Sequence, residues 1–97
     1  MLRMNLARGR RHARRAAGVL DELVDKQVSL LPQLPEHRRA AAADYLAELA
    51  LLAAAYRYYA DRWIGREELE RRGHVAIARL DELRAAQQHQ REFTDLD

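Results

Sequence analysis

The sequence contains no cysteine, a single serine and a single threonine. The missing thiols exclude disulfides, thiolate nucleophiles and cysteine-ligated metals. No phosphate-binding loop, nucleophile elbow or catalytic triad can be assembled from the remaining residues. The four histidines are scattered and lack the spacing of a metal site. We therefore predict that the protein is not an enzyme and carries no metal or cofactor.

Proline and glycine are also rare, with two and four copies, and β-branched residues are few. Sheets and turn-rich folds therefore have little to build with, whereas the abundant alanine, leucine, arginine and glutamate favour helices. Long hydrophobic runs are absent as well, because Arg57 and Asp61 interrupt the best candidate for a membrane span. The basic start lacks the apolar run of a secretory signal, so we expect a cytoplasmic protein. Its arginine enrichment is also a feature of mitochondrial transit peptides.

Acidic residues are absent from the first twenty positions, although the net charge of the chain is only +2. Arginines fill this region instead, and on a helix they would form a positive patch able to meet the phosphates of nucleic acid or an acidic protein surface. A solvated helix end with no partner is the third interpretation. The candidate binding residues are Arg8, Arg10, Arg11, Arg14 and Arg15.

The two prolines and the glycines divide the chain into three helices within one domain, residues 1–97. Pro32 and Pro35 separate the first two helices, and Gly65 is placed to serve as the N-cap of the third. Gly9 weakens helix formation before it, and Gly18 would allow a neighbouring helix to approach. The predicted elements are a basic lead-in 1–9, helices at about 10–31, 36–60 and 66–92, and a frayed tail 93–97.

The predicted fold is all-α: a three-helix antiparallel bundle, or a helical hairpin with an additional helix. The third helix has a weak point at Gly73, which follows Arg71 and Arg72 and has the pattern of a helix stop. The sequence predicts either a kink or a break there.

The middle helix is apolar on nearly every side, which is typical of a helix buried by more than one neighbour. One face, spaced by three and four residues, is the expected core stripe: Tyr45, Leu49, Leu52, Tyr56, Tyr59 and Trp63. We expect the opposite side to be covered by another copy of the chain, most simply in a two-fold dimer. The candidate protein interface there is Leu46, Ala50, Leu51, Ala54 and Tyr58.

Aromatic and basic residues also alternate at the end of this helix, around Tyr58, Arg62 and Trp63. Such a mixture is suited to stacking on the bases of a single nucleic-acid strand. The stripe spacing instead favours Trp63 as a core residue and Tyr58 as an interface residue.

The stretch YADRWIGREELERR, residues 59–72, resembles a helical-hairpin phrase that recurs in several unrelated families, including the coiled-coil insertion of large serine integrases. Arg62 stands where that phrase has glycine, and Gly65 where it has threonine. The resemblance implies a hairpin and no activity, since the catalytic and zinc-binding parts of those recombinases have no counterpart here.

Three functions fit these observations. The first is a non-catalytic helical interaction protein (an adaptor, inhibitor or assembly factor) that acts as a homo-oligomer and binds another protein. The second is a nucleic-acid-associated accessory protein that uses the basic N-terminal helix. The third is a small enzyme subunit or metal protein. The small size and arginine bias also fit a phage or mobile-element protein; neither a membrane nor a small-molecule substrate is expected as a partner.

Overall fold

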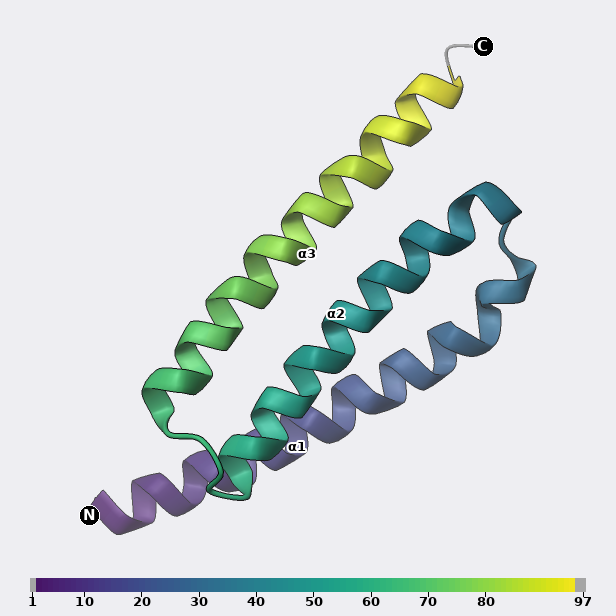
Figure 1. The fold of residues 1–97 in the computed structure, drawn as a ribbon. Coiled ribbons are helices and arrows are strands. Elements are labelled where there is room, and N and C mark those ends of the chain that lie inside the picture. The colour runs from purple at the N-terminus through teal and green to yellow at the C-terminus, as the bar shows by residue number, and fades with distance from the viewer. Residues whose placement is uncertain (1, 96–97) are drawn as a thin grey trace.

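The protein folds into three long helices in which the chain reverses direction at each connection (Figure 1). The computed structural model describes the backbone of residues 2–95 and the side chains of residues 8–89. Its elements are α1 (Leu2–Leu30), the short 3₁₀ helix η1 (Leu31–Gln33), α2 (Glu36–Ala60) and α3 (Arg66–Asp95). The predicted all-α antiparallel fold is confirmed. No helix in the described part of the chain has the length and hydropathy needed to cross a bilayer.

The bounds of α2 agree with the prediction, and Gly65 accepts the first hydrogen bond of α3 from Leu69, 3.0 Å away, as an N-cap residue does. The first helix begins earlier than the predicted start at about residue 10, because α1 begins at Leu2 and includes residues 2–9 of the predicted lead-in. Gly9 stays inside the helix, where a Cβ would lie 3.5 Å from the Tyr59 hydroxyl. The predicted tail is helical to Asp95, and residues 96–97 and 1 lie outside the described residues.

The predicted break at Gly73 is also wrong, since α3 runs through this residue as one straight helix (Figure 1). Gly73 does not adopt the positive φ of a helix stop. Arg71 and Arg72, which suggested that stop, instead pair with Glu68 one turn earlier in the same helix. The glycine therefore costs the helix about 1 kcal/mol without interrupting it.

The middle helix α2 packs against α1 on one side and α3 on another, and in the described residues α1 and α3 do not meet. The molecule is consequently elongated, 60 × 24 × 18 Å. Its radius of gyration is 16.4 Å, against about 12.5 Å for a compact domain of this length. The three helices form an open layer instead of a closed bundle.

Most of the buried residues between the helices are alanines, joined by Leu46 and Leu80. Ala53 and Ala55 are both buried, the former with none of its surface exposed. Two residues apart on a helix, they face nearly opposite sides of α2, so each side has a close neighbour. The α1 side also includes Ala60, whose carbonyl accepts a hydrogen bond from Arg14 at 3.4 Å. Alanine lets the helices approach closely but buries little apolar area. The larger side chains next to these alanines therefore remain partly exposed.

Polar pairs fix how far each flanking helix slides along α2. Arg57 pairs with Asp21 of α1. On the other side, the Arg84 guanidinium of α3 donates to the Tyr45 hydroxyl at 2.9 Å, and the Gln87 amide donates to the Ala41 carbonyl at 3.1 Å. The Arg57 and Arg84 pairs lie at the surface, so they define register more than they add stability.

Candidate functional site

The predicted core stripe of α2 is not enclosed in the structure. Five of its members are only half-buried, and we call this surface the open face: Tyr45, Leu49, Leu52, Tyr56 and Tyr59. The periodicity predicted correctly that these residues share a side of one helix. The flanking helices cover them only in part, because the most deeply buried contacts of α2 are at Ala53 and Ala55, on either side of this face, and α1 and α3 do not pack on each other over it.

Trp63, the sixth predicted core residue, is 75% exposed. It lies beyond the last residue of α2, in the turn where the chain changes direction, so the helical period no longer decides where it points. Its predicted place in the core is therefore wrong.

Apolar residues of both flanking helices border the open face. Leu30 of α1 lines a pocket of about 410 Å³ whose wall also includes Tyr45 and Gln87, so the pocket touches all three helices. Leu23 precedes Leu30 by seven residues and therefore shares its side of α1. On α3, Ile77 precedes Arg84, the partner of Tyr45, by the same interval. These apolar side chains are exposed.

The candidate interface on the other side of α2 is divided by the fold. Leu46 is buried within the monomer, because it lies seven residues before Ala53 on the α1 side of the helix. Ala54 and Tyr58 are half-buried, and only Ala50 and Leu51 are exposed, Leu51 by 64%. The exposed apolar area on this side is thus smaller than the sequence suggested, and Leu51 is its one large exposed side chain among the five candidates.

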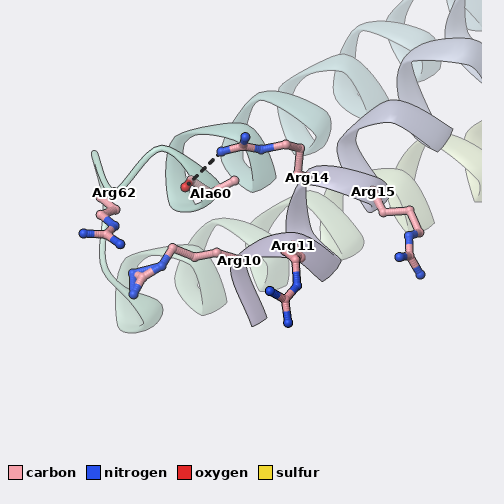
Figure 2. Close-up of a pocket in the computed structure, with 6 residues that line it drawn as sticks. All are labelled: Arg10, Arg11, Arg14, Arg15, Ala60 and Arg62. Carbon is pink, nitrogen blue, oxygen red and sulfur yellow. Dashed lines mark hydrogen bonds between the residues drawn. The ribbon is translucent and has the colours of Figure 1, made fainter. Parts of the chain in front are cut away.

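Several arginines lie near one another at the other candidate site, where α1 passes the end of α2 (Figure 2). They line a pocket of about 440 Å³, which we call the arginine pocket: Arg10, Arg11, Arg14, Arg15, Ala60 and Arg62. Four of the five candidate binding residues are therefore brought together, and Arg8 does not line the pocket. Arg14 donates to the Asp61 carboxylate at 3.1 Å. This carboxylate cancels one of the five positive charges.

Arg62 was not among the predicted site residues. Its unusual backbone conformation determines its position, and it also corresponds to a sequence feature that the prediction did not use. It has φ of 66°, the only positive value in the described part of the chain. Its N–H donates to the Tyr59 carbonyl, and that of Trp63 donates to the Tyr58 carbonyl, at 3.1 and 2.8 Å. This is the Schellman ending of a helix, in which glycine normally occupies the left-handed position. An arginine in place of the glycine of the hairpin phrase was the sequence signal.

The turn is held by a chain of contacts that starts in α3. The Trp63 and Tyr58 rings stack with centroids 5.5 Å apart and planes 8° from parallel. The Arg72 guanidinium lies 5.8 Å from the centre of the Tyr58 ring and donates to Glu68 at 2.9 Å. Hydrogen bonds from Arg71 and Arg72 lower the pKa of Glu68 to about 2, so this carboxylate is ionised at neutral pH. The result is a fixed Trp63 whose ring is otherwise open to solvent.

No group of three or more histidine, aspartate or glutamate side chains that could hold a metal ion occurs among the described residues. Comparison with protein-family models, with curated proteins and with solved structures finds no match. The open face and the arginine pocket are therefore the two features of the structure that bear on function.

Proposed function

We propose that the protein is a non-catalytic helical interaction protein that acts as a homodimer, with the open face of one molecule covered by a second copy. Its class is that of an adaptor, inhibitor or assembly factor, which works by presenting helix surfaces to other proteins. The observation that carries this proposal is the amount of surface left exposed.

The chain exposes 7665 Å², whereas a folded monomer of its mass is expected to expose about 5,700 Å². The surplus is about 2,000 Å² per molecule. If two copies hid this surplus from each other, the interface would lie within the range of roughly 2,000–5,000 Å² that is typical of permanent homodimers. The thin alanine contacts inside each molecule give a physical reason for such an association, because a short chain with little buried area gains stability from a partner.

The open face is suited to a second copy because its floor and both borders are apolar. A two-fold axis across it would place the Leu49 and Leu52 side chains of the two molecules against each other. Leu23 on one border and Ile77 on the other would extend the contact to α1 and α3. Tyrosines at the edges can bury their rings and keep their hydroxyls hydrated, which is common at protein interfaces.

Two neighbouring leucines provide a matched test. Leu52 lies on the open face, and Leu51 is an exposed residue on the far side of the same helix. Leu52→Asp should convert the dimer to monomers, because the interface would have to bury an unpaired carboxylate. Leu51→Asp should leave the dimer intact. Light scattering after size exclusion measures the mass, and circular dichroism confirms that both variants remain helical.

A third variant, Leu23→Asp, replaces a residue already exposed in the monomer and so separates loss of the dimer from loss of folding. It should weaken association without changing helicity. If Leu51→Asp alone disrupts the dimer, the second copy lies on the Ala50–Leu51 side and our assignment of the open face is wrong. A wild-type chain that stays monomeric at high concentration contradicts the proposal altogether.

A further inference from the structure

The arginine pocket contains more positive charge than the protein itself neutralises. Arg14 is committed to the end of α2 through its bonds to Ala60 and Asp61. Within the described part of the chain, the other four pocket arginines make no ion pair or side-chain hydrogen bond: Arg10, Arg11, Arg15 and Arg62. Like charges repel when they are held together, so a surface of this kind is a binding site for negative charge.

Arg62 carries one of these charges, and its backbone conformation makes the fold less stable than glycine would at this position. An L-residue in the left-handed region is roughly 1–2 kcal/mol less stable than one in the right-handed region, and glycine would avoid this penalty. Strain of this kind tends to occur where a side chain has a function. Here it adds a guanidinium to the lining of the pocket, about 50 residues along the chain from the arginines of α1.

The guanidiniums are arranged for an extended anion. In Figure 2 the Arg10 side chain extends toward the turn that carries Arg62, while Arg11 and Arg15 point away from that turn. Arg11 and Arg15 are one helical turn apart, which separates their Cα atoms by about 6 Å along the axis. Side chains that fan out in this manner cannot all coordinate one phosphate, but they can contact successive phosphates of a polymer.

An exposed aromatic platform follows directly after Arg62. Trp63 is fixed on one face by Tyr58 and is otherwise open, and Tyr58 is itself held by Arg72. Rigid aromatic rings next to a basic surface are the means by which many proteins bind single-stranded nucleic acid, since every base can stack on them. An acidic protein surface would have no comparable use for the exposed indole, and in a duplex the bases are already stacked on one another.

We propose that the arginine pocket and Trp63 form a binding site for single-stranded nucleic acid, in which the arginines contact phosphates and a base stacks on the indole. The site shares no residue with the open face, so the proposal does not rest on the proposed dimer interface. Recognition is through phosphate and stacking, so we expect little sequence preference.

The test uses the full chain and a labelled deoxythymidine oligomer of about 12 nucleotides, followed by fluorescence anisotropy. Trp63 is the only tryptophan, so quenching of its emission reports stacking directly. Trp63→Ala should weaken binding roughly 5- to 100-fold. The double variant Arg10→Gln with Arg11→Gln should weaken binding and flatten its salt dependence, since fewer phosphates are contacted. Arg79→Gln removes the same charge per site from α3, far along the sequence, and should change binding little.

Arg62→Gly separates a binding role from a structural one. It should weaken binding several-fold while making the fold more stable, because glycine relieves the backbone and removes a phosphate contact. Unchanged affinity in this variant would remove Arg62 from the site, and with it the argument from strain.

Three results would overturn the proposal. The first is no binding of the single strand at low salt. The second is a duplex of the same length bound as tightly as the strand without tryptophan quenching, since stacking would then have no role. The third is competition by polyglutamate at an equal concentration of charge, which would identify the pocket as a site for acidic proteins.

Discussion

The open face and the arginine pocket are both incomplete, but for opposite physical reasons. The open face has large apolar side chains that are only half-buried, while the pocket has guanidiniums without counter-charges. The first defect is relieved by burial and the second by an anion, so one partner does not satisfy both. Our two proposals therefore call for two separate partners, a copy of the protein for the open face and a charged polymer for the pocket.

The alanine contacts support both regions, and enlarging one of them should have the largest effect. Ala53→Leu introduces three heavy atoms where no surface is exposed, so α1 and α2 must move apart. We expect a loss of about 2–3 kcal/mol in the free energy of unfolding, measured by urea denaturation at fixed protein concentration. Ala50→Leu, the same change at an exposed position of α2, should alter it by less than about 0.5 kcal/mol. Equal effects of the two variants would show that the packing between α1 and α2 is loose.

Salt should separate the two regions next. If about four phosphates are contacted, raising monovalent salt from 50 to 200 mM should weaken single-strand binding roughly 50-fold. Dimer formation through apolar surface should not weaken, since burial of apolar groups does not depend on ion pairing. Anisotropy and sedimentation measured in the same buffers give both constants. Parallel weakening of the two would mean that the dimer is itself held by charge, contrary to our description of the open face.

Arg62→Gly tests whether the arginine pocket contains a residue that reduces the stability of the fold. We expect the free energy of unfolding to rise by about 1 kcal/mol, because the left-handed position no longer carries a Cβ. The thermal midpoint should rise accordingly. The neighbouring substitution Arg66→Gly, within the first turn of α3 and at ordinary φ, should instead lower stability. A decrease for Arg62→Gly would show that the side chain stabilises the turn, and that strain was the wrong explanation.

The sequence predicted local features of the backbone well and the packing between helices poorly. Proline and glycine placed α2 correctly, since these residues act locally on the backbone. Periodicity identified Tyr45 to Tyr59 as one face, but it cannot say whether a neighbour packs on that face or beside it. The neighbouring helices pack at Ala53 and Ala55, because small side chains allow close approach. Alanine does not stand out in a hydrophobic pattern, so periodicity did not predict this.

The arginine pocket shows the same limit. The basic run of α1 was evident from composition, whereas Arg62 is distant in the chain and joins the pocket only through the fold. The prediction of an interruption at Gly73 was wrong because the sequence alone does not distinguish a glycine that ends a helix from one that only weakens it. Gly18 was expected to admit a neighbouring helix, but it is exposed and no other atom lies within 4 Å of the Cβ position.

Gly18→Ala is therefore predicted to be harmless to packing and to stabilise α1. The gain should be about 0.5–1 kcal/mol in the free energy of unfolding, from better helix propensity and a less flexible unfolded chain. Neither dimer formation nor nucleic-acid binding should change. If stability falls in denaturant titration, Gly18 is in contact with something in the assembled protein, and the second copy would then have to reach this side of α1.

The smallest effect should come from Glu68 and its two arginine partners. Because the folded-state pKa is lowered to about 2, the ion pairs stabilise the fold at pH above the ordinary carboxyl value of 4.5, and this contribution is lost as the pH falls from about 4.5 to about 2. Glu68→Gln should lower the thermal midpoint slightly at neutral pH and leave it unchanged near pH 2. A variant equal to wild type at neutral pH would mean that the pairs, which lie at the surface, contribute nothing measurable.

The central claim is that one molecule of this chain exposes more apolar surface than three helices in an open layer can hide. Sedimentation equilibrium of the wild-type protein in moderate salt tests it most directly. We predict a mass of twice 11.2 kDa at micromolar concentration, with dissociation on changing Leu52 to Asp and none on changing Leu51 to Asp. A mass of one chain throughout the concentration range would contradict the account.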